Sequence, residues 1–249
     1  MKKYLLIIPF LLFPSVASAA ISGTLLTAGE TVAGNSTGTT ASITPAANQL
    51  ILLTVTARNA LSQAPTHPTV TGDGLTWVQV AASDYDTGPP TEKSVVVFRA
   101  MGASPTTGGV TIDYAGQAQT DILWAISQFN GVDTSGQNGS GAIAQSTTTA
   151  DQSVTTSTAT VTLVNPLANT NDVMFVGGAS DGAGGSLTSY GAGFTGLGTV
   201  SSTNIAGVAE EYAVNKTTGT LTWDSNHMLG MVGVELKNAV NRRKIISVD

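Results

Sequence analysis

The sequence contains no cysteine among its 249 residues. This absence excludes disulfide bonds, catalytic thiolates and thiolate metal ligands. A chain of this length without disulfide bonds must be held together by a hydrophobic core, and it is long enough to bury one.

Charge is also scarce, because only 10% of the residues are Asp, Glu, Lys or Arg, with 16 acidic and 10 basic residues. Nucleic acids and anionic membranes are bound by clustered Lys and Arg, so neither is expected as a partner. The two histidines, His67 and His227, are far apart in the sequence and form no ligand cluster for a transition metal.

Helical periodicity is missing as well, since no segment sustains apolar residues at a period of 3.6. Short runs rich in Val, Ile, Leu and Thr alternate instead with clusters of Gly, Asn, Asp and Pro, which predicts an all-β, antiparallel β-sandwich. The expected strands are Gln49–Ala57, Leu75–Ala81, Ser94–Ala100, Gly109–Tyr114, Ile122–Phe129, Ala142–Ser146, Ser157–Val164, Val173–Gly177, Ala206–Val214, Gly219–Trp223 and Leu229–Leu236.

The first 19 residues have the three zones of a bacterial-type signal peptide: the basic Met1–Lys3, the uncharged apolar Tyr4–Val16 and the small-x-small site Ala17–Ala19. The apolar run is shorter than the roughly 20 residues that a membrane span needs. We therefore expect cleavage before Ala20, export to the periplasm, cell surface or medium, and no membrane insertion afterwards. No cysteine follows the apolar zone, so lipoprotein processing is excluded.

The second half of the chain repeats the order of elements of the first half. Asn48–Leu53 corresponds to Asn171–Val176, and Val110–Asp113 corresponds to Leu221–Asp224. Each half then ends on a last apolar strand. This order predicts a duplicated set of strands.

The predicted domain is therefore one β-sandwich over residues 20–238, built from half repeats at 20–133 and 138–238 and followed by a C-terminal tail at 239–249. The seam falls near Asp133–Gln137. Two arrangements are compatible with the pattern: one composite, jelly-roll-like sandwich, which we favour, or two tandem Ig-like sandwiches.

The segments ANQLILLTV (47–55), GDGLTWVQV (72–80) and WAISQFNGVD (124–133), with NDVMFVGGASDG (171–182) and TGTLTWD (218–224) in the second half, form a characteristic pattern. This pattern resembles duplicated β-sandwich modules of secreted bacterial and phage-associated proteins, which have no assigned activity. The resemblance covers residues 36–238. It implies display, adhesion or carbohydrate contact at the cell exterior, and it carries over no catalytic or ligand-binding residue.

The segment Gly178–Gly182 matches the G-x-S-x-G motif of serine hydrolases, with Ser180 as the nucleophile and His67 or His227 as a base. A nucleophile elbow requires a helix after the serine, and the Gly-rich residues that follow predict a turn instead. A glycoside hydrolase would need two facing carboxyl groups. The adjacent Glu210 and Glu211 point to opposite faces of a strand, so one of them is expected to face inward.

Asp84, Asp86 and Glu92 place three carboxylates in one turn-rich segment, and carboxylate oxygens are the ligands that Ca²⁺ prefers. Calcium is therefore the one possible cofactor that the sequence suggests. The spacing lacks the full EF-hand pattern, and Asp residues also form turns.

Exposed aromatic rings would serve a carbohydrate-binding surface. Tyr85, Tyr190 and Phe194 lie in segments expected to be loops and are the candidate ligand-binding residues. Trp77, Trp124 and Trp223 lie in predicted strands and are expected in the core.

These observations favour a non-catalytic extracellular module for surface display or adhesion, with weak carbohydrate binding and a glycan or cell-surface partner. A structural subunit of an extracellular or virion-like assembly is the alternative. A secreted hydrolase is a second alternative.

Overall fold

The computed structural model of the chain describes residues 19–61, 63–86, 92–152, 156–182, 186–203 and 206–239. Residues 1–18 of the predicted signal peptide and residues 240–249 of the predicted tail lie outside this part. The described residues form β-strands and one short 3₁₀ turn, η1 (Ser140–Ala142), and none lies in an α-helix. No helix among them is long and apolar enough to cross a membrane.

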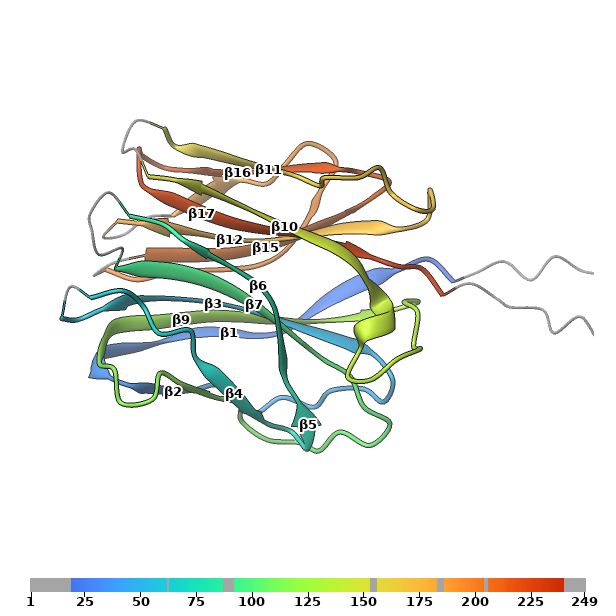
Figure 1. Cartoon of the computed structure of the whole chain (residues 1–249), viewed down its shortest axis with the longest axis horizontal. Coiled ribbons are helices and arrows are strands. Elements are labelled where there is room, and N and C mark those ends of the chain that lie inside the picture. Colours follow the sequence, from blue (N-terminus) through green and yellow to red (C-terminus); the bar gives the residue numbers. More distant parts are fainter. Residues whose placement is uncertain are drawn as a thin grey trace, which may run out of the picture.

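Four antiparallel sheets are stacked as layers, and the two middle layers are five-stranded (Figure 1). The first middle sheet has the spatial order β1 (Ser22–Asn35), β9 (Gln119–Asn130), β3 (Leu50–Asn59), β7 (Lys93–Ala100), β6 (Val78–Asp84). The second has the order β10 (Ile143–Asp151), β17 (Leu229–Leu236), β12 (Val173–Asp181), β15 (Ala206–Val214), β14 (Thr195–Ser201).

Each middle sheet is covered on its outer side by a smaller sheet. The four-stranded sheet over the first half has the order β2 (Thr37–Thr39), β8 (Thr111–Asp113), β4 (Thr69–Gly72), β5 (Leu75–Thr76). The three-stranded sheet over the second half has the order β11 (Thr158–Thr162), β16 (Thr218–Trp223), β13 (Leu187–Ser189).

The two middle sheets have the same strand order when strands are counted from the start of each half and the two-residue strand β5, which has no counterpart in the second half, is left out. The central strand is β3 in one sheet and β12 in the other, and the edge strands are β1 and β6 against β10 and β14. The predicted all-β antiparallel sandwich is confirmed. The choice between one composite sandwich and two tandem sandwiches stays a prediction. That the halves are related in sequence stays a prediction.

Strands of the middle sheets are apolar on both faces because each sheet is covered on both sides. In β3, Leu50 and Leu52 belong to the central core between the two five-stranded sheets. Ile51 and Leu53 face the four-stranded sheet instead. A third core lies between the other middle sheet and the three-stranded sheet and includes Val161 and Trp223.

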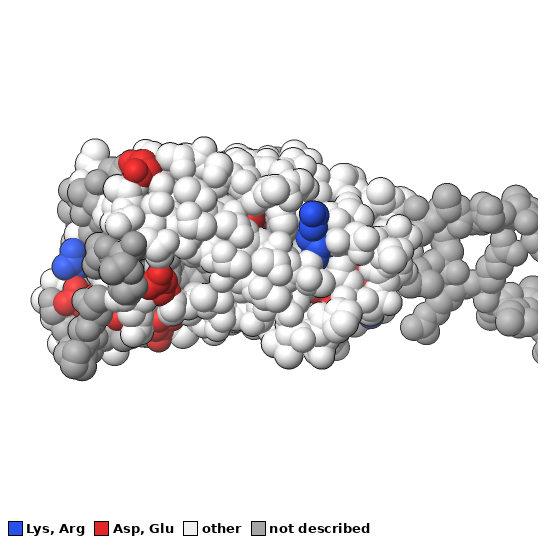
Figure 2. Space-filling model, turned by 90° about the horizontal axis from the view of Figure 1, so that it is seen from above, with Lys and Arg blue, Asp and Glu red and all other residues white. Residues whose placement is uncertain are grey.

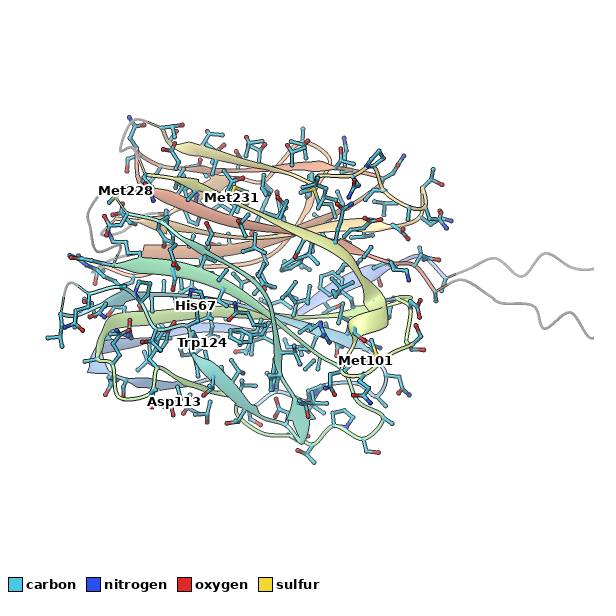
Figure 3. All side chains as sticks on the ribbon, in the orientation of Figure 1. His67, Met101, Asp113, Trp124, Met228 and Met231 are labelled. Atoms are coloured by element: carbon cyan, nitrogen blue, oxygen red, sulfur yellow. The ribbon has the colours of Figure 1, made fainter. Side chains whose placement is uncertain are left out.

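The predicted core positions of Trp124 and Trp223 are confirmed, with exposed fractions of 4% and 2%. Trp77 is only half-buried, against the core beneath the four-stranded sheet. Trp124 lies in the core beneath the four-stranded sheet (Figure 3). Both ends of the described chain leave the same end of the molecule (Figure 1). There the Asn238 amide donates a hydrogen bond of 2.8 Å to the Ala19 carbonyl.

Each expected strand range contains a strand, but β1, β2, β4, β13 and β14 lie outside the expected ranges. The sequence of β1 contains glycines and few β-branched apolar residues, and the structure shows what two of these glycines, Gly23 and Gly29, allow. A Cβ at Gly23 would lie 2.6 Å from the Phe129 ring, and one at Gly29 would lie 3.1 Å from the Trp124 ring. The glycines therefore let β1 approach the aromatic rings of β9.

We expect Gly177→Ala to destabilise the chain, because a Cβ at this position in β12 would lie 2.4 Å from Oγ1 of Thr54 on the facing sheet. Overpacking of this kind costs about 1–3 kcal/mol. Thr54→Ala removes the two nearest obstructing atoms and leaves Cγ2 of Val97 at 3.0 Å, so the double variant is expected to lose less stability than the sum of the two single variants. Chemical denaturation measures this coupling. Strict additivity would show that the two sheets do not meet at these residues.

Candidate functional site

Among the described residues, all ion pairs except Lys237–Asp133 gather at one end of the sandwich, where β3, β6 and β12 end and β7 begins. Figure 2 shows charged side chains crowded at this end while most of the remaining face is uncharged. His67 pairs with Asp84 at 3.0 Å and Arg58 pairs with Glu92 at 3.1 Å. We call this region the charged end.

Lys93 is the buried centre of the charged end, with an exposed fraction of 6%. Its ammonium lies 3.2 Å from Oδ2 of Asp86 and 2.5 Å from Oδ2 of Asp181. Asp181 ends β12, so this contact joins the first half of the chain to the second. Its other oxygen accepts the backbone N–H of Met228 at 3.1 Å. Such a buried network favours one relative arrangement of the sheets more than it adds net stability.

The three carboxylates predicted for calcium each have a different cationic partner. Asp84 pairs with His67, Asp86 with Lys93, and Glu92 with Arg58. Within the described ranges, which omit residues 87–91, no group of three or more His, Cys, Asp or Glu side chains is placed to hold a metal ion.

Ser180 is fully buried inside β12, where its backbone pairs with Gly207 and Leu229. Its hydroxyl has no hydrogen-bond partner among the described residues. The segment after it contains the extended strand β13 rather than a helix. The G-x-S-x-G match therefore lacks both the exposed hydroxyl and the helix of a nucleophile elbow.

His227 lies beside Asp224 and Ser225, but it does not relay a proton between them. Both the Ser225 hydroxyl, at 2.8 Å, and the Asp224 carboxylate, at 3.4 Å, approach the same ring nitrogen, Nε2. A catalytic triad places the serine and the acid on opposite ring nitrogens.

The interpretation of Tyr85 as an exposed platform is wrong, because the structure buries this ring completely. The residue follows β6 directly, and its ring packs over Gly230, where a Cβ would lie 2.4 Å away. Its hydroxyl lies 2.9 Å from Oγ1 of Thr56. Tyr190 and Phe194 are half-buried against the core beneath the three-stranded sheet, so their role in binding stays a prediction.

Glu210 and Glu211 are both buried, although only one was expected to face inward. Glu210 points into the central core, where Ser127 Oγ donates to its Oε2 at 2.5 Å and the Thr54 N–H donates to Oε1 at 3.2 Å. Glu211 points to the other side of β15 and accepts the Gly191 N–H at 2.7 Å. Both faces of this strand are covered, so neither carboxyl reaches solvent.

Burial raises the pKa of both carboxyl groups, because the charged form loses its hydration. The pKa of Glu210 rises to about 8, and the hydrogen bonds from Ser127 and Thr54 oppose this change. The pKa of Glu211 rises to about 7. At neutral pH the central core therefore holds Glu210 largely as a neutral acid.

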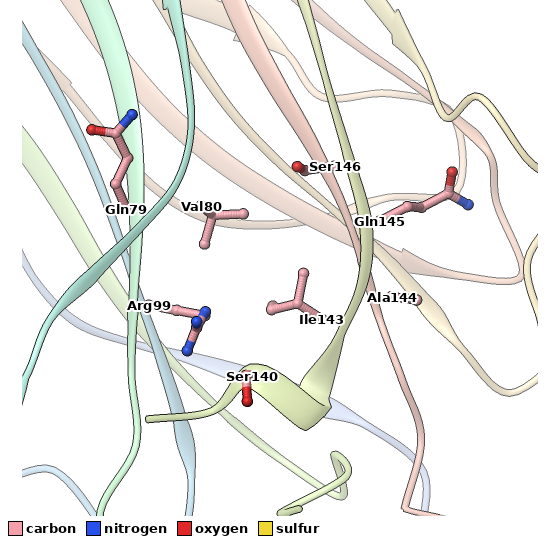
Figure 4. Close-up of a pocket in the computed structure, with 8 residues that line it drawn as sticks. All are labelled: Gln79, Val80, Arg99, Ser140, Ile143, Ala144, Gln145 and Ser146. Atoms are coloured by element: carbon pink, nitrogen blue, oxygen red, sulfur yellow. The ribbon is translucent and has the colours of Figure 1, made fainter. Parts of the chain in front are cut away.

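An open hollow of about 330 Å³ lies between the edge strands β6 and β10, away from the charged end. Figure 4 shows the side chains that line it, with Val80 and Ile143 on opposite walls and Arg99 and Ser140 toward one end. The Gln145 amide is turned away and is occupied by hydrogen bonds to Asn165 and Glu235. We call this hollow the edge groove.

Arg99 gives the edge groove its charge. It follows Val95 and Val97 on the face of β7 that borders the central core, at the point where the core opens to solvent. One guanidinium nitrogen donates to the carbonyls of Gln137 and Asn138, at 3.2 and 2.5 Å. Partial burial lowers the pKa of Arg99.

Among the described basic side chains, Arg58, Lys93 and Lys237 form ion pairs with carboxylates, whereas Arg99 and Lys216 form none. Arg99 was not among the site residues predicted from the sequence. The sequence did contain an indication of this residue. Arg99 is the only basic residue in the otherwise apolar run Val95–Ala100, and it alternates with Val95 and Val97 on the inward face. The groove itself depends on how two edge strands from different halves meet.

Comparison of the chain with protein-family models, curated proteins and solved structures gives no match.

We expect Glu210→Gln to stabilise the chain at pH 8 and to change little at pH 5. The carboxyl has a pKa of about 4.5 in the unfolded chain and about 8 in the fold, so the folded state retains a proton that the unfolded state releases in between. Stability therefore falls as the pH rises through this window. Each unit of pKa difference between the folded and unfolded states changes the free energy of unfolding by about 1.4 kcal/mol. The amide side chain of the Glu210→Gln variant does not titrate, so this pH dependence is lost.

Urea denaturation across pH 5–9 measures the effect. Glu30→Gln in β1, at an exposed position, is the matched control and is expected to leave the pH profile unchanged. An equal change in stability at every pH for Glu210→Gln would contradict the assignment of Glu210 as a neutral buried acid.

Proposed function

We propose that the exported chain is a non-catalytic binding module for surface display or adhesion, and that the edge groove binds a carboxylate-bearing saccharide. The observation that carries the proposal is an arginine without a carboxylate partner, among the described residues, in an open hollow of about 330 Å³. A hollow of this size accommodates one or two sugar rings, at the lower end of the range of ligand sites.

The chemistry of the groove suits an acidic sugar. The guanidinium of Arg99 uses one nitrogen for the backbone carbonyls of residues 137 and 138, which leaves other N–H groups to donate to a carboxylate. Val80 and Ile143 offer apolar walls for the C–H faces of a ring, and the hydroxyls of Ser140 and Ser146 match sugar hydroxyls.

Because the rest of the surface carries little charge, Arg99 is the group expected to select a carboxylate-bearing ligand. The chain has more acidic than basic residues, and an acidic ligand would be repelled by the charged end. A site built around Arg99 lies away from the carboxylates of the charged end, near the start of β6 rather than at its end.

The test is calorimetric titration of the purified mature chain with an oligogalacturonate, against a neutral oligosaccharide of the same length. We expect the uronate to bind and the neutral sugar to bind at least tenfold more weakly. Arg99→Gln should reduce the affinity for the uronate by about 10- to 100-fold, since hydrogen bonds to charged groups contribute about 1.5–3 kcal/mol.

Lys216→Gln is the matched control, because it removes the other described basic side chain that has no ion pair and lies outside the groove. Ser146→Asp places a competing carboxylate in the groove and leaves Arg99 in place, so it should block the uronate without disturbing the hydrogen bonds of Arg99. Binding that survives both Arg99→Gln and Ser146→Asp would overturn the proposed site.

A further inference from the structure

Lys93 and Asp181 continue the inward-facing rows of two strands that lie in the two facing middle sheets (Figure 1). Along β7, Lys93 alternates with Val95 and Val97, whose side chains lie in the central core. Along β12, Asp181 comes two residues after Ala179, which lies in the same core. Both rows reach the charged end, so two packed strands bring one amine and one carboxyl group together there.

The Lys93 amine contacts two carboxyl groups from different parts of the chain. Its Nζ lies 2.5 Å from Oδ2 of Asp181 and 3.2 Å from Oδ2 of Asp86. The side chains of Lys93, Asp86 and Asp181 are only 7, 10 and 15% exposed. One lysine and two aspartates therefore form a nearly dry cluster, in which both carboxyl groups reach the same nitrogen.

The carboxyl group of Asp181 is also held by the backbone through its second oxygen. The Met228 N–H donates to Oδ1 at 3.1 Å, and the Asp181 N–H donates to the Met228 carbonyl at 2.9 Å. Oδ2 is thereby turned toward the amine. A backbone N–H at Oδ1 stabilises the negative charge that develops on this oxygen when a nucleophile adds to the carboxyl carbon.

A buried aromatic ring, that of Tyr85, lies beside the cluster. It is fully buried and packs over Gly230 on β17. Burial raises the pKa of its hydroxyl, and the nearby charges of Asp181 and Asp86 act in the same direction. The ring therefore borders both carboxyl groups. Charges that are enclosed in this way have lost most of their hydration.

We propose that Lys93 and Asp181 condense to an amide that covalently joins β7 to β12. Asp86 takes a proton from the Lys93 ammonium, and the neutral amine adds to Cγ of Asp181. The new C–N bond forms, and the bond between Cγ and Oδ2 breaks. Two of the three ammonium protons pass through Asp86 to Oδ2, which leaves as water, and the third stays on the amide nitrogen. Asp86 ends as the carboxylate that it was at the start.

The reaction is favoured because it removes charge from the interior. A buried ammonium and a buried carboxylate become one neutral amide, and their desolvation cost disappears. The two strands hold the reacting groups in contact, which replaces a high reactant concentration. The sequence has no cysteine for a disulfide bond, and an amide between the halves would restrict the unfolded chain in the same way.

Lys237 and Asp133 provide an internal comparison, as the other lysine–aspartate pair among the described residues. Their charged atoms are 3.4 Å apart, and their side chains are 38 and 21% exposed. Among the described ion pairs, Lys237 contacts a single carboxylate. Water hydrates both groups, and no second carboxylate carries the proton. The proposal therefore assigns no amide to this pair.

Intact-mass spectrometry of the purified mature chain tests the proposal. The wild-type chain should be lighter than its sequence by about 18 Da, the mass of the one water that condensation releases. Proteolysis should then yield a branched peptide that contains both Lys93 and Asp181. Lys93→Arg keeps the positive charge but has no nucleophilic amine, so this variant should show its full sequence mass. Lys237→Arg is the matched control and should retain the loss.

Asp86→Asn keeps both reacting groups and removes the proton carrier, so most of this variant should remain at full mass. An undiminished loss of water in Asp86→Asn would overturn the role of Asp86. Circular dichroism establishes that the variants are folded, and the mass of the wild-type chain decides the proposal even if a variant does not fold.

A succinimide formed by Asp181 with the Gly182 nitrogen would release the same mass of water. It would persist in Lys93→Arg and would give no branched peptide. A wild-type chain of full sequence mass, or a loss that persists in Lys93→Arg, would therefore overturn the proposal. Saccharide binding by the edge groove is measured independently, so either proposal can fail alone.

Discussion

The packing of two five-stranded sheets against each other determines the environment of nearly every other feature. Because each of these sheets is also covered on its outer side, strands such as β3 and β12 are buried on both faces. Polar groups on them have no route to solvent. Some find partners inside, whereas the Ser180 hydroxyl has none among the described residues. Glu210 meets Ser127 and Thr54 across the central core for this reason, and its pKa rises.

The same packing moves charge to the ends of the strands. Lys93, Asp86 and Asp181 meet where strands of both halves terminate, and the contact of Lys93 with Asp181 joins the halves at this end. At the other end, Arg99 continues an inward-facing row and lies where the two middle sheets separate. The edge groove is thus a consequence of two sheets that meet in the centre and diverge at an edge.

Solvent-facing strands satisfy a different requirement, because the two outer sheets need β-forming residues that are also polar. Threonine meets both conditions, and cross-strand threonine pairs stabilise a sheet. Regular alternation then places the hydroxyls in a lattice on the three-stranded face. The binding hypothesis concerns Arg99 in the edge groove, which forms no ion pair with a carboxylate among the described residues.

The sequence predicted the strands that are apolar on both faces, because runs such as LILLTV have no other stable environment in a chain without helical periodicity. It did not predict four layers, since the pairing of one sheet face with another depends on contacts far apart in the sequence. Tyr85 was predicted to lie in an exposed loop. Its ring is buried because it packs over Gly230, which is far from it in the sequence. Glu211 was unexpected inside because the sheet covering its face comes from β11, β13 and β16.

The central claim is that the two halves share one core and fold as one unit. Differential scanning calorimetry of the mature chain tests it directly. A shared core predicts one unfolding transition in which the calorimetric and van't Hoff enthalpies are equal. Two resolved transitions, or a van't Hoff enthalpy of about half the calorimetric value, would show that the halves are independent domains.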